Sequence, residues 1–498
     1  MANKACNEVV TVANMPMTVF DMISAMQNKY ADRVAFRYVE GKDTVVEKTY
    51  AQYVQDIRKA TGYLQQELGE PKGKKIVILS RTNYEYGAVV FGTMMAGAVI
   101  VTLNQGKTWA ELEYELGMVE PDLIFNDGID YGYRAQLEAL YGAQLRPMDA
   151  WTAAPEAEMV NRIDHEGLLM LMFTSGTTGR SKGVMLSEKN YFTACQMYID
   201  GLKSVLDYEE RLVPQYLDQT FSHFTLVPMF HLAGFICYFV YGIQGWTLNL
   251  CCDARDLRRD MSLMHSDAMS TPPVLVEMIC NEVKRGHADR LNGSCSSAIL
   301  DPAILSDLVK NGFYINQCYS MTELAGYGLL NVTQEGDHLR ALGKPDGFSE
   351  VKVDETGEIC VRGGCVMLGY YKDPEATAET IDKDGWLHTG DLARVDEEGY
   401  YYMTGRKKNL IILDSGENVS PEELEKLLGK CDAIKECIVK EMGKKIGTVV
   451  CCEDDKQQQV KAFVTELNRT LPMYKRISVV ECSAEPLPRN ALGKLLRK

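Results

Sequence analysis

The chain is poor in the features that mark several large classes of protein. None of its 15 cysteines forms a C-x-x-C pair, and two adjacent pairs, Cys251-Cys252 and Cys451-Cys452, are poorly placed for an intrachain disulfide or a tetrahedral zinc site. We therefore expect mostly buried cysteines in a reducing compartment. Basic residues are also scarce: 53 Lys and Arg face 69 Asp and Glu, giving a net charge of −16. This deficit argues against nonspecific nucleic-acid binding.

The first residues lack the pattern of a secretory signal. Residues 1–10 include Lys4 and Glu8 and have no apolar core, so we expect no signal peptide and a cytoplasmic protein. Two stretches with almost no charge, Tyr86 to Gln105 and Phe224 to Cys252, are long enough to cross a bilayer. Both are interrupted by glycines, and a buried helix followed by a buried strand explains them better, because parallel sheets bury both faces. We expect no transmembrane segment.

The length of 498 residues exceeds what one compact core supports, so we expect at least two domains. Most of the chain alternates helical and strand-like patterns without an internal repeat, which predicts an α/β fold with a mostly parallel, layered sheet. The helices are expected at 50–68, 83–95 and 190–202, and the strands at 75–80, 98–103, 123–126, 168–173 and 314–318.

The pattern changes from Gly347 onward, where short strands are separated by Asp/Gly turns. A cationic stretch with few apolar residues, 405–409, then indicates an interdomain hinge. We predict an N-terminal domain of residues 1–405, with a β-rich subdomain at about 347–405, and a small α+β C-terminal domain of residues 406–498. From residue 406 to the end, 18 basic residues outnumber 14 acidic ones, which suits a lobe that meets an anionic ligand.

One loop is rich in small and hydroxylated residues. Residues 174–184 read Thr-Ser-Gly-Thr-Thr-Gly-Arg-Ser-Lys-Gly-Val and follow an apolar run. A strand that ends in such a loop offers N–H groups, hydroxyls and a cation to a phosphate chain. The loop is not a Walker A loop, because Lys182 is followed by Gly183 rather than Ser or Thr. Taken alone, it is equally well explained as a flexible surface loop.

Four further positions have both a chemical and a structural interpretation. Thr322-Glu323 follows a predicted strand and could offer a hydroxyl to a phosphate and a carboxylate to Mg²⁺, or could cap a helix. Asp391 follows a Thr-Gly turn and could bind two ribose hydroxyls, or could stabilise the turn. His231 stands in an apolar run, where a core histidine is the simpler explanation. Lys494 could be an ordinary solvated charge near the end of the chain.

These motifs occur in an order that resembles the adenylate-forming superfamily, which includes acyl-CoA synthetases, luciferases and the adenylation domains of peptide synthetases. Thr-Ser-Gly-Thr-Thr-Gly-x-x-Lys-Gly resembles its phosphate loop. Tyr-Ser-Met-Thr-Glu at 319–323 resembles Tyr-Gly-x-Thr-Glu, with a serine in place of glycine, and residues 385–391 match Gly-Trp-x-x-Thr-Gly-Asp. Residues 488–494 match Pro-x-x-x-x-Gly-Lys, and residues 405–425 look most like fatty-acid ligases. The matches run from Thr49 to Lys494.

The resemblance implies a role for each matched residue. Thr322 would contact the α-phosphate, Glu323 would bind Mg²⁺, and Tyr319 would pack on adenine. Asp391 would hold the ribose with the help of Arg406. The phosphate loop would comprise Thr174, Ser175, Gly176, Thr177, Thr178, Gly179 and Lys182. The catalytic residues would be Lys494, His231, Thr322 and Lys182, and Lys408 would be the domain hinge.

The resemblance also implies an acyl pocket. Residues 227–234 resemble the Pro-x-Phe-His-x-x-Gly segment of acyl-CoA and aryl-CoA ligases, so His231 would line the carboxylate end of the pocket. Amino-acid-activating relatives carry an Asp near this position and this segment has none, which argues against an amino-acid substrate. Ser296, Ser297 and Ala298 stand where the family has Gly-Gly-Ala in the pocket wall, so added hydroxyls would narrow or polarise the pocket.

The expected reaction joins a carboxylic acid, by preference a fatty acid, to a thiol. The acid would react with ATP and Mg²⁺ to give acyl-AMP and pyrophosphate, and coenzyme A would then displace AMP. A shortened segment after Met442, in a region that lies near the incoming thiol in relatives, leaves the acceptor open. One alternative is transfer to the phosphopantetheine arm of a carrier protein. Another is a non-catalytic nucleotide-binding protein, against which the intact lysines and carboxylates of the motifs argue.

Overall fold

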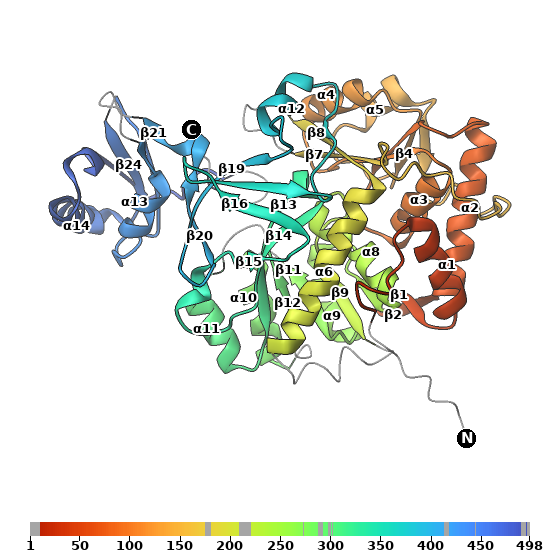
Figure 1. The fold of residues 1–498 in the computed structure, drawn as a ribbon, viewed down its shortest axis with the longest axis horizontal. Helices are drawn as coiled ribbons and strands as arrows, with labels where there is room; N and C mark the ends of the chain where they lie inside the picture. Colours follow the sequence, from red (N-terminus) through yellow and green to blue (C-terminus); the bar gives the residue numbers. More distant parts are fainter. Residues whose placement is uncertain are drawn as a thin grey trace. The chain divides into compact units, whose positions relative to one another are not determined.

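The computed structural model describes residues 10–174, 181–208, 221–271, 273–286, 292–296, 300, 302–412, 418–443, 445–489 and 495 (Figure 1). The chain divides into two compact units, and it passes between them more than once. Unit 1 comprises Met1–Val351 and Val361–Leu387, and unit 2 comprises Lys352–Cys360 and His388–Lys498. The boundary predicted at residue 405 concerns a hinge between moving domains, and it stays a prediction.

Unit 1 contains a nine-stranded sheet whose central strands are parallel. The five pairings from β1 through β10, β9, β11 and β12 to β13 are parallel, and the pairings at the two edges are antiparallel. In spatial order the strands are β15 (Lys344–Pro345), β14 (Gly326–Asn331), β13 (Ile315–Met321), β12 (Asn292–Cys295), β11 (Ala268–Thr271), β9 (Ser222–Thr225), β10 (Thr247–Leu250), β1 (Val34–Glu40) and β2 (Thr44–Thr49).

A second sheet of unit 1 has seven strands and is parallel except at one edge. Its order is β18 (Gly369–Tyr370), β8 (Lys182–Leu186), β7 (Met170–Thr174), β4 (Val99–Thr102), β3 (Lys75–Leu79), β5 (Leu123–Asn126) and β6 (Leu145–Pro147). The pairings of β8 with β7 and with β18 are antiparallel. Together the two sheets confirm the predicted α/β class with largely parallel strands. The antiparallel strand β8, which begins at Lys182, was not predicted.

Helices connect and cover these strands. They are α1 (Val19–Lys29), α2 (Tyr50–Leu68), α3 (Tyr84–Met95), α4 (Trp109–Val119), α5 (Arg134–Tyr141), α6 (Glu188–Tyr208), α8 (Leu232–Gln244), α9 (Leu257–Leu263), α10 (Pro273–Lys284), α11 (Pro302–Lys310) and α12 (Pro374–Thr380). Thr49 and Gln52 form a reciprocal capping box that fixes the start of α2 at the predicted residue.

The two uncharged stretches are buried helices followed by buried strands, as predicted. Every residue of α3 except Glu85, which precedes the uncharged stretch, is buried, and so are all four residues of the following strand β4. Helix α8 is followed in the same way by β10, whose four residues are buried. Within the described part of the chain, no helix combines the length and the apolar character that a bilayer span requires.

Helix α6 packs closely on the edge of the nine-stranded sheet and on α8. A Cβ atom added to Gly201 of α6 would lie 2.1 Å from the hydroxyl oxygen of Tyr327 on β14, so only glycine fits at this position. Tyr191 of α6 stacks on Phe239 of α8 with ring centroids 5.0 Å apart. This packing places α6 and α8 together over one face of the sheet, and the two helices form one wall of the pocket described below.

Unit 2 contains smaller sheets and two longer helices. The four-stranded sheet, to which both units contribute residues, has the order β16 (Ser349–Val353), β17 (Glu358–Gly363), β19 (Leu387–Val395) and β20 (Tyr401–Arg406). The C-terminal part has β21 (Ile411–Ile412), β22 (Asn418–Val419), α13 (Pro421–Leu428), β23 (Glu436–Glu441), β24 (Ile446–Cys451), α14 (Gln457–Thr470) and β25 (Val479–Ser483). Val439, Leu424 and Val464 belong to its apolar core.

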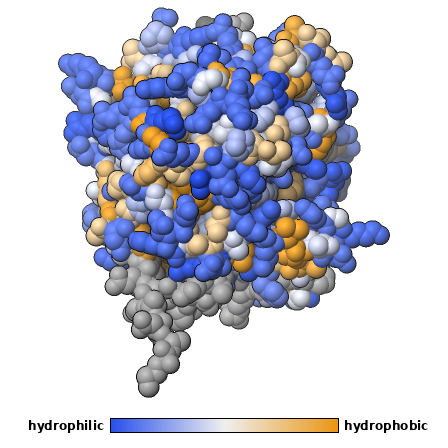
Figure 2. Space-filling view, turned by 90° about the vertical axis from the view of Figure 1, so that its right-hand side faces the viewer, coloured by the Kyte–Doolittle hydropathy of each residue, from blue (hydrophilic) through white to orange (hydrophobic). Residues whose placement is uncertain are grey.

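The surface in Figure 2 is mostly hydrophilic, and its hydrophobic atoms form small separate patches. Scattered apolar residues of this kind are normal on a globular protein and need no partner. The candidate functional sites are therefore the pocket of unit 1 and the polar clusters of each unit.

Candidate active site

Lys182 is anchored at the start of strand β8. It lies opposite Thr174, the last residue of β7, in an antiparallel pair. The five predicted loop residues between them, Ser175, Gly176, Thr177, Thr178 and Gly179, lie outside the described residues. The amine of Lys182 is 4.6 Å from the centre of the Tyr370 ring, which is the distance of a cation–π contact. Tyr370 belongs to β18, the strand that pairs with β8.

Glu323 reaches the same tyrosine from the other sheet of unit 1. It lies in a 3₁₀ turn, η3 (Thr322–Leu324), directly after β13, and the next residue, Ala325, has a positive φ of 52° that ends the turn. The Tyr370 hydroxyl donates to Glu323 Oε1 over 3.0 Å. The structure therefore brings the predicted phosphate-loop lysine over the ring of one tyrosine and the predicted Mg²⁺-binding carboxylate to its hydroxyl.

Tyr370 remains a phenol in this position. Burial, reinforced by the negative charge of Glu323 and by the hydrogen bond to it, raises the pKa of Tyr370 well above its usual value. The backbone N–H of Tyr370 donates to Thr377 Oγ1 over 2.8 Å, which fixes the residue against α12. Sequence reasoning missed Tyr370, because a single tyrosine outside the matched motifs carries no local signal of its contacts.

The other predicted residues around the turn are half-buried. Tyr319 lies on β13 opposite Leu329, next to an irregularity in the pairing of β13 with β14. Thr322 begins the 3₁₀ turn three residues later. Their predicted contacts with adenine and with the α-phosphate stay predictions.

In unit 2, Asp391 and Arg406 face each other across two strands. They are paired residues of β19 and β20, and Arg406 Nε lies 3.0 Å from Asp391 Oδ1. Asp391 is 7% exposed, and its N–H donates to Thr389 Oγ1 over 3.1 Å. The turn predicted before Asp391 is wrong, because Thr389 and Gly390 lie within strand β19. Gly390 has a φ of 74°, a conformation that favours glycine, so the strand is irregular just before Asp391. The structure thus pairs the two residues that were predicted to act together.

A buried carboxylate, Glu358, supports this part of β19. Glu358 accepts from the N–H of Gly390 over 2.8 Å and from the amine of Lys407 over 2.7 Å, and it is 2% exposed. The side chains of Asp354, Cys360 and His388 lie close enough together to hold a metal ion. Burial raises the pKa of the Cys360 thiol to about 11, so this sulfur is not a ready ligand, and Lys407 adds a positive charge beside the cluster. The cluster is explained as structural support for β19 around Gly390.

The two remaining lysines with predicted roles are in unit 2. Lys408 is exposed and lies in a 3₁₀ turn, η5 (Lys407–Asn409), which directly follows β20. Its role as a hinge stays a prediction. Lys494 lies outside the described residues.

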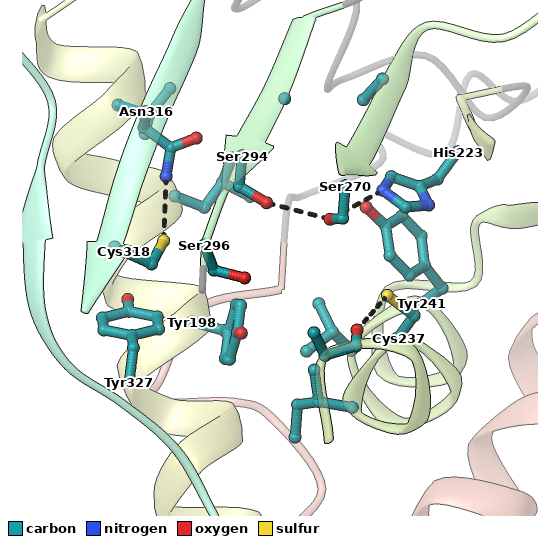
Figure 3. Close-up of a pocket in the computed structure, with 18 of the residues that line it drawn as sticks. Tyr198, His223, Cys237, Tyr241, Ser270, Ser294, Ser296, Asn316, Cys318 and Tyr327 are labelled. Atoms are coloured by element: carbon teal, nitrogen blue, oxygen red, sulfur yellow. Dashed lines mark hydrogen bonds between the residues drawn. The ribbon is translucent and has the colours of Figure 1, made fainter. Parts of the chain in front are cut away.

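A pocket of about 100 Å³ opens in unit 1 between α6, α8 and the nine-stranded sheet (Figure 3). Ser296 lines it, whereas Ser297 and Ala298 lie outside the described residues. The assignment of these residues to an acyl pocket stays a prediction. His231 is not among the described lining residues. It is the N-cap of α8, where its Nδ1 accepts from the N–H of Ala233 over 3.4 Å, and the following turns of α8 line the pocket.

Sequence reasoning missed one histidine of this pocket, His223. The residue is 1% exposed on β9, and its ring lies 4.5 Å from the ring of Tyr241, centre to centre. Burial lowers the pKa of His223 to about 3, so the ring is neutral. A histidine within a short apolar strand gives no sign in the sequence of the cavity that it faces.

Comparison with known proteins fits this architecture. The sequence pattern of the AMP-binding enzyme family matches residues 24–371. The chain belongs to this family. The predicted membership of the adenylate-forming superfamily is thereby confirmed.

The relatives include several CoA ligases. The peroxisomal OPC-8:0-CoA ligase 1 of Arabidopsis thaliana is 28% identical over 476 residues, which cover 87% of this chain and 84% of that protein. A long-chain-fatty-acid–CoA ligase of Escherichia coli O157:H7 is 27% identical over 545 residues, covering 97% and 93%. The o-succinylbenzoate CoA synthetase of Bacillus subtilis, solved with its acyl-adenylate intermediate, has a TM-score of 0.80 at 23% identity and 96% coverage of both chains. The structural likeness shows a shared fold.

Proposed function

We propose that this protein is an ATP-dependent acid–thiol ligase that forms acyl-AMP from a carboxylic acid and then transfers the acyl group to coenzyme A. The observation that carries the proposal is the arrangement of Lys182, Tyr370 and Glu323. A lysine and a carboxylate that share one tyrosine offer a cation for the phosphates of ATP and an oxygen ligand for Mg²⁺. The names of the relatives as CoA ligases support the second step.

The first step requires positive charge. The carboxylate of the acid attacks the α-phosphorus of ATP, a P–O bond to pyrophosphate breaks, and negative charge builds on the phosphoryl oxygens. Lys182 would offset this charge, with Thr322 as a hydrogen-bond donor. Glu323 fits a magnesium ion because it offers a hard carboxylate oxygen whose position is fixed by a neutral phenol. When bound, the ion would neutralise phosphate charge.

The second step breaks the acyl–phosphate bond. The thiol sulfur of coenzyme A attacks the acyl carbon, AMP leaves, and a thioester forms while the thiol proton is lost to solvent or a base. Coenzyme A carries phosphates of its own, which the excess of basic over acidic residues after Arg406 would attract. The pocket of unit 1 supplies space for the acyl group.

The test is pyrophosphate release from ATP and Mg²⁺ with a panel of fatty, aromatic and short carboxylic acids. At least one acid should release pyrophosphate, and adding coenzyme A should raise AMP formation and produce acyl-CoA. Acyl-AMP that stays bound when coenzyme A is added would instead favour transfer to a carrier protein. Failure of every acid to release pyrophosphate, from protein that still binds ATP, would favour a non-catalytic nucleotide-binding protein.

Tyr370→Phe should weaken the use of Mg²⁺ without disturbing the fold. The variant loses one hydrogen bond to a carboxylate, about 1.5 kcal/mol, which corresponds to roughly a tenfold change. Pyrophosphate release should therefore require a higher Mg²⁺ concentration for half-maximal rate.

Tyr371→Phe is the matched control for this prediction. It removes a hydroxyl from the neighbouring ring, over which Lys372 lies, and should leave the Mg²⁺ dependence as in the unmodified protein. An identical Mg²⁺ dependence for both variants would remove Tyr370 from the site.

A further inference from the structure

The pocket of unit 1 has two different walls. The wall formed by α6 and α8 is mostly apolar, with Leu202, Val205, Ile236 and Val240 among its residues. The wall formed by the sheet carries hydroxyl, amide and thiol groups. A pocket for a plain hydrocarbon chain needs no such groups, and burying them without partners costs free energy.

The polar groups of the sheet form one row across three parallel strands. Ser270 of β11 pairs with Ser294 of β12, and Ser294 pairs with Asn316 of β13, so the three side chains lie on the same face. All three line the pocket (Figure 3). Ser296 lies two residues further along the chain, about 7 Å away at the rise of a strand, and also lines the pocket.

A chain of hydrogen bonds runs along this row from a buried histidine. His223 Nε2 lies 3.1 Å from Ser270 Oγ, and Ser270 Oγ lies 2.9 Å from Ser294 Oγ. His223 Nδ1 is buried and has no hydrogen-bond partner among the residues that the structure describes. A buried N–H donor without a hydrogen bond is rarer than a buried acceptor without one. This favours the tautomer with the proton on Nε2, which leaves Nδ1 as an acceptor.

With this tautomer, His223 Nε2–H donates to Ser270. The Ser270 hydroxyl can then donate to Ser294 or to the neighbouring Cys237 thiol, which also forms a hydrogen bond with Ser270. In the first arrangement the Ser294 hydroxyl hydrogen is available to a ligand in the pocket, and in the second a Ser294 lone pair is available. The ring is neutral because burial lowers the pKa of His223 to about 3, so it brings no positive charge to the row.

Two further groups extend the row. Asn316 Nδ2 donates to Cys318 Sγ over 3.6 Å, and its Oδ1 makes no hydrogen bond to any part of the chain that the structure describes. The Ser296 hydroxyl points into the pocket in Figure 3 and likewise has no partner among the described residues. The row therefore offers both donors and an acceptor to a ligand.

The described lining of the pocket contains no Asp, Glu, Lys or Arg. An ionised group on the ligand would find no opposite charge there, and its desolvation would be costly. The complementary ligand group is an uncharged oxygen function, such as a carbonyl or a hydroxyl, on an otherwise apolar chain or ring.

We infer that the acid activated by this protein carries an uncharged hydrogen-bonding oxygen in its tail, which binds the row Ser270, Ser294, Asn316 and Ser296. This inference rests on the proposed function. It names a substrate class narrower than fatty acids in general: oxo or hydroxy acids with an apolar remainder.

The experiment compares matched acids. Straight-chain acids from butanoate to dodecanoate are each paired with the acids in which one methylene is replaced by a carbonyl or a hydroxymethylene, at every position in turn. Pyrophosphate release gives kcat/KM for each. The best oxygenated acid should exceed its plain partner by roughly tenfold or more, since a site built to hydrogen-bond a substrate group discriminates against the analogue that lacks it.

The variants Ser294→Ala and Ser270→Ala/Ser294→Ala should each lower this ratio severalfold. Both acids are measured on one preparation, so the ratio is independent of how much of the variant is folded. Thr225→Val is the matched control, because Thr225 pairs with Ser270 in the same row but does not line the described pocket. This control should keep the ratio.

The outcomes separate the inference from the function on which it rests. A preference for the plain acid in every pair would overturn the inference and leave the ligase intact. An oxygen preference that survives both serine variants would overturn the role of the row. A failure of all acids to release pyrophosphate would overturn the proposed function and the inference together.

Discussion

Replacing Asp391 with Ala is expected to weaken ATP binding by about 2–4 kcal/mol, because two charge-assisted hydrogen bonds to the ribose hydroxyls would be lost. The side chain is suited to this role, since Glu358 binds the N–H of the preceding Gly390 in β19 and Arg406 orients the Asp391 carboxylate. Isothermal titration calorimetry with ATP measures the loss. The fold should survive, because Arg406 is 43% exposed and its charge can be solvated when its partner is gone.

Asp396→Ala separates ligand binding from turn stabilisation. Asp396 lies on the same hairpin and accepts from the N–H groups of Glu398 over 3.0 Å and Tyr400 over 2.9 Å, which is the pattern of a turn aspartate. This variant should lower the melting temperature and leave ATP affinity unchanged. If Asp391→Ala behaves in the same way, Asp391 is a structural residue and its assignment to the ribose is wrong.

The elements that the sequence predicted well are those with local signals. The predicted helix at 50–68 begins and ends as α2 does, because its capping box and its apolar spacing lie within the segment itself. The two uncharged stretches form α3 followed by β4 and α8 followed by β10. They could be predicted because a continuously buried segment lacks charged residues. Strand β8 has no such signal, since it pairs antiparallel at the edge of a sheet that is otherwise parallel.

The same distinction between local and non-local signals holds for the candidate site residues. Lys182, Glu323 and Asp391 could be proposed from the sequence because each stands in a contiguous motif, and their roles stay predictions. Tyr370 could not be found, because its contacts depend on β18 pairing with β8. Tyr370 pairs with Val184, from which it is 186 residues distant in the sequence, and no local pattern encodes that approach.

The polar row of the pocket could be predicted only in part from the sequence. The sequence predicted that hydroxyls at Ser296 and Ser297 would polarise the pocket, and Ser296 does line it. Ser270, Ser294 and Asn316 come from three strands, and only their register places them side by side. Register in a parallel sheet is set by tertiary packing, so a residue pattern within each short strand does not reveal the row.

Replacing Lys494 with Ala is expected to block the formation of acyl-AMP and to spare the transfer of a supplied acyl group. The prediction rests on the match of residues 488–494 to Pro-x-x-x-x-Gly-Lys, whose lysine is expected to reach the α-phosphate during the first step only. Loss of one preorganised group that stabilises transition-state charge costs on the order of 10²–10³ in rate. The second step attacks an acyl carbon rather than a phosphate, so it does not need this cation.

Two assays on the same preparation measure the two steps. Pyrophosphate release from acid and ATP should fall by about that factor, while AMP release from supplied acyl-AMP and coenzyme A should stay near normal. Lys435→Ala is the matched control, since Lys435 is a surface lysine of unit 2 that pairs with Glu453 over 3.1 Å. It should leave both steps unchanged. Near-normal pyrophosphate release by Lys494→Ala would show that this lysine is an ordinary surface charge, and an equal loss of both steps would point to a damaged fold instead.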